Sequence, residues 1–202
     1  MIAIVDYGVG NLFSLKSSLQ SLGLESLVTS DKKAILSADR VILPGVGAFG
    51  DAADKLNETG LADTVREVAA NGTPLLGICL GMQLLFERGY EYGEHRGLGL
   101  LKGEVRPLAE DVTGLKIPHM GWNSLIFTKP SPLFKYTCEG DYVYFVHSFQ
   151  AKKCEDSLLA YCEYGTTPVT AACGSGNVYG TQFHPEKSGP VGMKILRAFA
   201  EL

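Results

Sequence analysis

The segment Leu75–Phe86, which reads LLGICLGMQLLF, indicates the fold of this chain better than any other. Leu75–Ile78 is an unbroken apolar run of the length of a buried strand, and Leu80–Phe86 is typical of the start of a helix. Between them lies Cys79, with a glycine two positions away on either side. This is the G-x-nucleophile-x-G pattern of a sharp strand-to-helix turn. The segment therefore predicts an α/β protein with a cysteine at the end of a buried strand.

The residues before this segment alternate between apolar runs and stretches with helical periodicity. Ile2–Val5 and Val41–Leu43 lack polar alternation, as in strands covered on both faces. Asn11 suits the N-cap of a helix in which leucines recur every three or four residues. The other elements predicted here are a strand at Leu24–Thr29 and helices at Lys32–Leu36 and around Leu61–Val68. Strands that alternate with helices in this way predict a parallel sheet.

The second half has a different pattern. Helical periodicity disappears from about Gly97 until a final helix that includes Val191. Between these points we predict strands at Trp122–Phe127, Tyr142–Phe149, Leu158–Glu163, Val169–Cys173 and Val178–Phe183. The last two are joined by Gly174–Asn177, a sequence typical of a hairpin. We therefore expect one α/β domain over residues 1–202, with a mixed, mainly parallel sheet flanked by helices and an antiparallel portion in the C-terminal half.

The composition excludes several classes of protein. Of the 202 residues, 18 are Lys or Arg and 22 are Asp or Glu, so the net charge of −4 argues against nucleic-acid or membrane-surface binding. The longest apolar run, Pro74–Met82, is much shorter than the roughly 20 residues of a membrane-spanning helix. The start of the chain lacks the basic region of a secretory signal. Five scattered cysteines without zinc-type spacing fit reduced thiols, so we expect a cytoplasmic protein without a metal site.

A nucleophilic cysteine needs a base, and four histidines compete for that role. His184 follows a predicted strand, and Glu186 can reach its imidazole if the segment is extended, because residues i and i+2 point to the same side. A carboxylate in that position orients the ring and stabilises its charged form. The other three histidines fit this role less well: His95 fits an exposed loop, and His119 and His147 fit structural positions. Taken separately, Cys79 also fits an ordinary buried thiol, but the combination favours a catalytic pair.

A glycine-rich loop supplies a rival interpretation. The segment Pro44–Gly50, PGVGAFG, contains G-x-G-x-x-G after a strand, the pattern of a dinucleotide-binding turn. A non-catalytic nucleotide-binding module is therefore an alternative. Two features weaken it, because the loop follows the third predicted strand instead of the first and Pro44 stiffens its entry. Glycine N–H groups that face an oxyanion beside Cys79 fit better.

Several motifs resemble a known family. GICLGMQLLF (77–86) and QFHPEKS (182–188) resemble the nucleophile and His/Glu motifs of class I, triad-type glutamine amidotransferases. DYGVGNLFSL (6–15), PGVGAFG (44–50) and IPHMGWN (117–123) narrow the resemblance to the glutaminase subunits of imidazole glycerol phosphate synthases. The resemblance implies a single type 1 glutamine amidotransferase domain and no cofactor. A glutaminase subunit of the anthranilate, guanylate or pyridoxal phosphate pathway is the alternative within the class.

The resemblance also implies roles for individual residues. Cys79 attacks the carboxamide of glutamine to form a thioester, His184 carries protons, and Glu186 orients His184. Water then releases glutamate. The oxyanion is expected at the N–H of Leu80 and at an N–H of Gly45, Val46 or Gly47, which has to reorient first. The residues expected to bind glutamine are Gly47, Gln83, Ser148 and Phe149.

A partner chain is expected for a chemical reason. Ammonia released into water at neutral pH is mostly protonated and no longer nucleophilic, so it needs a protected route to its acceptor. The glutaminase motifs occupy the whole chain, and the resemblance implies a TIM-barrel cyclase subunit as the partner in a heterodimer. That subunit makes imidazole glycerol phosphate and an aminoimidazole carboxamide ribonucleotide. The interface residues implied are Asn11, Met120, Trp122 and Lys187. Trp122 fits a core aromatic equally well.

Overall fold

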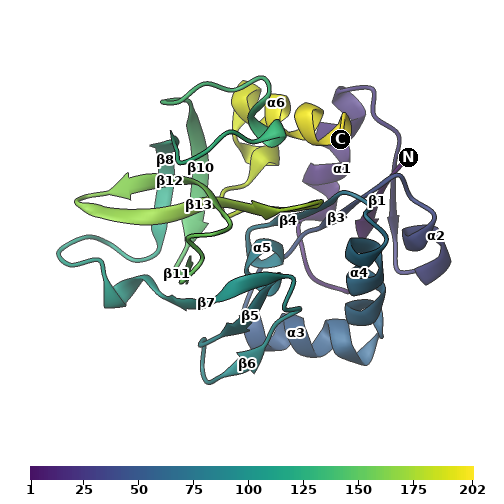
Figure 1. Ribbon diagram of the computed structural model, residues 1–202, viewed down its shortest axis with the longest axis horizontal. Helices are drawn as coiled ribbons and strands as arrows, with labels where there is room; N and C mark the ends of the chain where they lie inside the picture. Colours follow the sequence, from purple (N-terminus) through teal and green to yellow (C-terminus); the bar gives the residue numbers. More distant parts are fainter.

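The computed structural model describes residues 1–202, and its centre is an eight-stranded sheet (Figure 1). In their order across the sheet the strands are β2 (Ser26–Thr29), β1 (Ile2–Val5), β3 (Arg40–Leu43), β4 (Leu75–Ile78), β14 (Val178–Thr181), β13 (Thr167–Ser175), β12 (Leu158–Tyr164) and β9 (Ile126–Phe127). The first five strands in this order are parallel to one another, and the last three continue the sheet antiparallel. The predicted mixed, mainly parallel sheet with an antiparallel C-terminal portion is confirmed.

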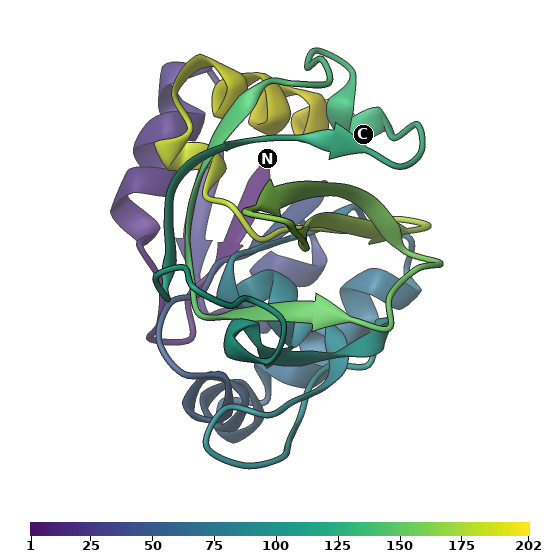
Figure 2. The ribbon, with the colours of Figure 1, turned by 90° about the vertical axis from the view of Figure 1, so that its left-hand side faces the viewer.

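Helices cover both faces of the sheet. On one face lie α1 (Leu12–Ser21) and α6 (Gly189–Ala200), and on the other lie α2 (Lys32–Leu36), α3 (Phe49–Glu58), α4 (Leu61–Ala70) and α5 (Leu80–Leu84) (Figures 1 and 2). The residues of β1 alternate between the two faces: Ile2 and Ile4 join the core under α1 and α6, whereas Ala3 and Val5 join the other core. Because both faces are buried, the strand needs apolar residues at every position.

Two smaller sheets pack beside the large one. The first contains β11 (Phe149–Lys152), β7 (Leu101–Pro107), β5 (Phe86–Gly89) and β6 (His95–Arg96), in that order. The second, which we call the β8–β10 ribbon, consists of β8 (His119–Ser124) and the antiparallel β10 (Tyr142–His147). Short 3₁₀ turns complete the chain: η1 (Leu108–Glu110), η2 (Pro132–Phe134) and η3 (Pro185–Lys187). No helix in the structure is both long enough and apolar enough to cross a membrane.

Several predicted boundaries were wrong. The helix predicted for Leu80–Phe86 ends at Leu84, because Phe86 already begins β5. Tyr142–Phe149 is two strands, β10 and β11, which join different sheets on either side of Ser148. The prediction for Trp122–Phe127 likewise merged β8 with β9, and it began β8 three residues late. The strand predicted to end at Phe183 ends at Thr181.

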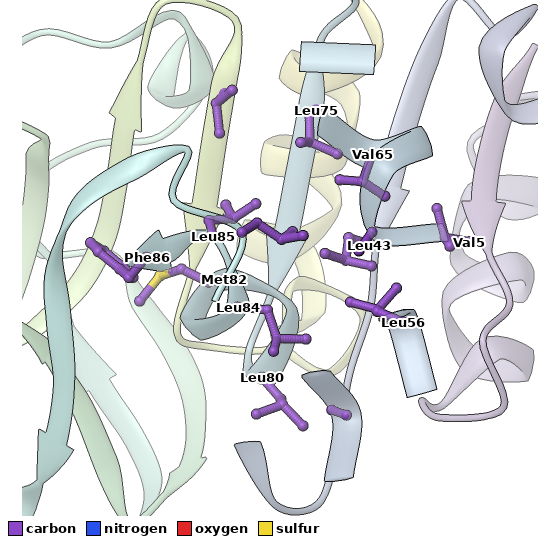
Figure 3. Close-up of a cluster of buried hydrophobic side chains, with 14 of the residues drawn as sticks. Val5, Leu43, Leu56, Val65, Leu75, Leu80, Met82, Leu84, Leu85 and Phe86 are labelled. Atoms are coloured by element: carbon purple, nitrogen blue, oxygen red, sulfur yellow. The ribbon is translucent and has the colours of Figure 1, made fainter. Parts of the chain in front are cut away.

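The core on the α3–α5 side fixes the helix that follows Cys79. Figure 3 shows Leu80 and Leu84 of α5 in the same cluster of buried side chains as Leu43 of β3 and Leu56 of α3. All four side chains are almost completely buried. Although α5 is only five residues long, this packing orients it against the sheet, since tertiary contacts stabilise helices too short to form alone.

The turn between β4 and α5 is possible only because its neighbours are glycines. Cys79 has φ 54° and ψ −112°, a conformation that side-chain-bearing residues rarely adopt. A Cβ atom on Gly81 would lie 1.9 Å from the carbonyl oxygen of Leu43, and one on Gly77 would lie 2.7 Å from the carbonyl oxygen of Gly81. The glycines therefore let the turn approach neighbouring backbone that cannot move away.

We expect Gly81→Ala to lower the free energy of unfolding by about 3 kcal/mol or more, because the new methyl group would overlap the backbone of β3. Gly23→Ala is the matched control: its site is open and only the positive φ of 72° opposes the change, at a cost of roughly 1–2 kcal/mol. Urea denaturation measures both. A cost for Gly81→Ala no greater than that for Gly23→Ala would contradict this account of the turn.

Candidate active site

The predicted site residues follow the carboxyl ends of three adjacent parallel strands. The loop that begins at Pro44 follows β3, Cys79 follows β4, and His184 lies shortly after β14. These strands are neighbours in the sheet, so their ends converge at one edge, where open α/β sheets bind ligands. A cavity of about 400 Å³ lies there, lined by both Cys79 and His184 although they are far apart in sequence.

Cys79 is buried and its backbone is tied to the neighbouring strand. Its N–H donates to the carbonyl oxygen of Thr181 at 2.7 Å, and its own carbonyl accepts from the N–H of Gln83 at 3.1 Å. The sulfur lies at the N-terminal end of α5, where unpaired N–H groups favour negative charge. The thiol is therefore fixed at the floor of the cavity by backbone hydrogen bonds on both sides.

Gln182 was not predicted as a site residue, and it contacts the sulfur directly. Its Nε2 donates to Cys79 Sγ at 3.7 Å, and its Oε1 accepts from Gln83 Nε2 at 2.9 Å. The side chain is completely buried. Its position in the sequence, two residues before His184, is the feature that could have identified it. Gln182 links the sulfur to the residue expected to bind glutamine.

His184 and Glu186 form a buried pair. Nδ1 of His184 donates to Oε1 of Glu186 at 2.8 Å, and both side chains are at least 96% buried. Burial lowers the pKa of His184, but the neighbouring groups of Cys79 and Glu186 outweigh it and raise the pKa to about 9. The imidazole is thus charged at neutral pH and interacts with a sulfur on one side and a carboxylate on the other.

From the sequence we expected the segment that carries this pair to be extended, but it is not. Pro185–Lys187 forms the 3₁₀ turn η3, and the N–H of Lys187 donates to the carbonyl of His184 at 3.0 Å. The backbone of His184 is also tied to β10, because its N–H donates to the carbonyl of Tyr144 at 3.0 Å. The pair forms because the turn curls the carboxylate back toward the ring.

Most residues expected to bind glutamine or its oxyanion line the same cavity. They are Val46, Gly47, Leu80, Gln83, Ser148 and Phe149. Gly45 does not line it, because a Cβ there would lie 2.7 Å from the Tyr7 hydroxyl and 2.9 Å from the N–H nitrogen of Gly81. The structure adds lining residues that the sequence did not suggest: Glu91, Pro118, Val146 and His147.

The glycine-rich loop is anchored at both ends. At its start the hydroxyl of Tyr7 donates to the carbonyl of Pro44 at 2.8 Å, and at its end the N–H of Phe49 donates to Oε2 of Glu91 at 2.8 Å. Burial, followed by the nearby Cys79, raises the pKa of Tyr7, so the hydroxyl stays protonated and able to donate. Between these anchors Val46 and Gly47 are exposed, and Gly47 has a positive φ of 96°.

Of the four interface candidates, only Lys187 lines the cavity, and two of the others are strongly exposed. Met120 is 60% exposed and Trp122 is 54% exposed, so the interpretation of Trp122 as a core aromatic is wrong. Lys187 is exposed and lines the cavity. Asn11 is half-buried, and its side chain caps α1 by accepting from the N–H of Ser14, as the sequence predicted.

The comparisons with known proteins agree on one family. Residues 3–202 match the model of the family described as glutamine amidotransferase class-I. The chain is similar to "Imidazole glycerol phosphate synthase subunit HisH" of Lactococcus lactis, with 52% identity over 99% of this chain and 98% of the relative. The same subunit of Geobacillus kaustophilus is 53% identical over 98% of this chain and 95% of the relative. The fold is similar to "Structure of PurLQS from Thermotoga maritima", with a TM-score of 0.76 at 23% identity over 99% of this chain and 97% of that chain.

We expect the His184 imidazole to titrate with a midpoint near pH 9, because Cys79 and Glu186 on either side favour its charged form. Since this pKa exceeds the unfolded value of about 6.5, the charged ring stabilises the fold fully below pH 6.5, and this contribution is lost as the pH rises through 9. Glu186→Gln removes one partner and should lower the midpoint. Glu67→Gln, an exposed change on α4, is the matched control and should not.

Nuclear magnetic resonance of 15N-labelled histidine follows the titration directly. A wild-type midpoint at or below 6.5, or one that Glu186→Gln leaves unchanged, would contradict this description of the pair.

Proposed function

The chain belongs to the class I glutamine amidotransferases and, within them, to the HisH glutaminase subunits of imidazole glycerol phosphate synthase, and from this we propose how its residues hydrolyse glutamine. The observation that carries the proposal is the cavity that Cys79 and His184 share, with His184 bonded to a buried carboxylate. Cys79 is the nucleophile, His184 the general acid and base, and Glu186 the residue that orients His184.

The reaction proceeds in two halves. The Cys79 thiolate attacks the side-chain carbonyl carbon of glutamine, and the charged imidazole of His184 gives its proton to the departing nitrogen, so that ammonia leaves and a γ-glutamyl thioester remains. The neutral imidazole then removes a proton from water, which attacks the thioester. The tetrahedral intermediate collapses, glutamate leaves, and the thiolate and imidazolium are restored. The pKa of about 9 supports the first step, because the acid is loaded at neutral pH.

The oxyanion of each intermediate is stabilised by backbone N–H groups. The N–H of Leu80 begins α5 directly after the nucleophile, and we propose it as the first donor. The second comes from the exposed part of the glycine-rich loop, Val46 or Gly47. Gly45 is the weakest of the sequence candidates, because it packs against the backbone of Gly81 away from the cavity.

The remainder of glutamine fits the other wall of the cavity. Gln83 and the backbone at Ser148 and Phe149 line that wall, and Gln83 Nε2 donates to the carbonyl of Phe149 at 3.3 Å. We propose that these groups bind the α-amino and α-carboxylate groups of the substrate. Gly47 lies on the same cavity and keeps the loop free of side-chain bulk beside the substrate.

The family resolves the alternatives drawn from the sequence. The relatives that match along the whole chain are subunits of imidazole glycerol phosphate synthase, which acts in histidine biosynthesis. A non-catalytic nucleotide-binding module, the rival interpretation of the glycine-rich loop, does not fit that membership. We further propose a cytoplasmic location.

We propose that the ammonia acceptor lies on a TIM-barrel cyclase subunit that docks over the cavity mouth. The outward face of the β8–β10 ribbon supports this, because cross-strand pairing puts Trp122 beside Tyr144 and Met120 beside Val146. Trp122 and Tyr144 meet edge to face with ring centres 6.0 Å apart. Val146 also lines the cavity, so an apolar surface continues to the site itself. A partner seated there would cover the mouth and receive ammonia without exposure to water.

We expect Cys79→Ala to abolish glutamine hydrolysis by the complex with the cyclase subunit, a loss of at least a thousandfold, because no other group can form the thioester. Cys138→Ala is the matched control, since Cys138 is an exposed thiol, and it should retain full activity. Glutamate release measures both. Substantial hydrolysis by Cys79→Ala would refute the proposed mechanism.

We expect Trp122→Ala to weaken binding of the cyclase subunit by about 2 kcal/mol, because exposed tryptophans that become buried at interfaces contribute strongly. Leu27→Ala is the matched control: Leu27 is an exposed apolar residue on β2, at the opposite edge of the sheet from the antiparallel strands. Isothermal titration calorimetry measures both affinities. Equal affinities for the two variants would contradict docking of the cyclase subunit on the β8–β10 ribbon.

A further inference from the structure

A buried pair of histidines lies next to the glutamine cavity and takes no part in the proposed chemistry. His119 on β8 and His147 on β10 stand opposite each other in the register of the ribbon. They are 3% and 6% exposed, and Nδ1 of His119 lies 3.0 Å from Nε2 of His147. His147 lines the cavity, whereas His119 does not and is connected to it through His147.

The hydrogen-bond partners determine where the protons are. Nδ1 of His147 lies 2.7 Å from the carbonyl oxygen of Phe149, which can only accept, so that nitrogen carries the proton. Burial lowers the pKa of His147 to about 3 and that of His119 to about 4, so both rings are neutral. Nε2 of His147 is then an acceptor, and His119 Nδ1–H donates to it.

The ring of His119 is held in one orientation. It stacks on Phe145 with ring centres 4.8 Å apart and lies against Tyr164 with ring centres 4.3 Å apart. Tyr164 is fixed in turn, because its hydroxyl donates to the carbonyl of Lys116 at 2.7 Å. The direction of the His119 N–H is therefore set by two aromatic neighbours.

This chain of hydrogen bonds ends at the wall that binds glutamine. The carbonyl of Phe149 accepts from His147 and also from Gln83 Nε2. If His119 donated nothing, the buried Nε2 of His147 would lack a partner, which is costly. The proton of His147 would then be free to move from Nδ1 to Nε2. The unprotonated Nδ1 and the carbonyl oxygen of Phe149 would both be acceptors, so the hydrogen bond between them would be lost.

We propose that His119 is a positioning residue for glutamine: by donating to Nε2 it stabilises the Nδ1–H tautomer of His147, and thereby the hydrogen bond that holds the Ser148–Phe149 backbone in the conformation that binds the α-substituents. The inference rests on the proposed function, because it assigns that wall to the substrate. It assigns His119 no contact with glutamine and no part in proton transfer. We therefore expect the loss of His119 to change KM for glutamine, whereas kcat depends on Cys79 and His184.

Two substitutions separate the hydrogen bond from the packing. His119→Phe keeps a ring between Phe145 and Tyr164 but removes the donor. His119→Asn keeps an N–H donor close to the position of Nδ1 but removes the ring. Both are tested as the complex with the cyclase subunit. We expect KM for glutamine to rise roughly tenfold in His119→Phe with kcat within about twofold of wild type, and KM to stay within about threefold in His119→Asn.

The opposite pattern overturns the proposal. If His119 only fills space, His119→Phe behaves as wild type and His119→Asn is the damaged variant. A second readout needs no variant: in the wild-type protein the 15N resonances of His147 should show a protonated Nδ1 and an unprotonated Nε2, and the reverse assignment overturns the proposal even if His119→Phe does not fold. If the wild-type complex hydrolyses no glutamine, the proposed function itself fails. If it does, and His119→Phe is unaffected, only the role of His119 fails.

Discussion

The backbone of Cys79 is the constraint on which the rest of the site depends. A residue in its conformation is strained by roughly 1–3 kcal/mol, and such strain persists only where the surroundings leave no alternative. Here the surroundings are the carbonyl of Leu43, which approaches too closely for any side chain at Gly81, and the core that fixes α5. The strain has a use, because the turn places the thiol on the cavity that the imidazole of His184 also lines.

The β8–β10 ribbon connects the two sides of the proposed function through strand alternation. Met120 and Trp122 face outward, whereas His119 faces His147 and the core. Successive residues of one short strand thus belong to the proposed docking surface and to the support of the glutamine wall. This arrangement explains why a single motif, IPHMGWN, contains residues with such different surroundings.

The sequence predicted the parts of the structure that depend on local pattern. The strand β4 has the predicted bounds, and the Cys79 turn forms where its flanking glycines indicated. The sequence analysis did not predict β5, β6 and β7: β5 and β6 are too short for a periodic pattern, and the alternation in β7, with Lys102 and Glu104 between apolar or glycine positions, is interrupted by Gly103. It also missed Gln182 and the partnership of His119 with His147. These depend on which strands become neighbours, and hydrophobic pattern does not specify that.

The proposed mechanism requires that the sulfur of Cys79 becomes covalently bonded to the γ-carbonyl carbon of glutamine. The most direct measurement is a rapid acid quench of the complex during turnover of isotope-labelled glutamine, followed by mass spectrometry of its peptides. We expect a labelled γ-glutamyl group on the peptide that contains Cys79 and on no other. Steady turnover with no adduct at any quench time, or with the label on a different residue, would contradict it.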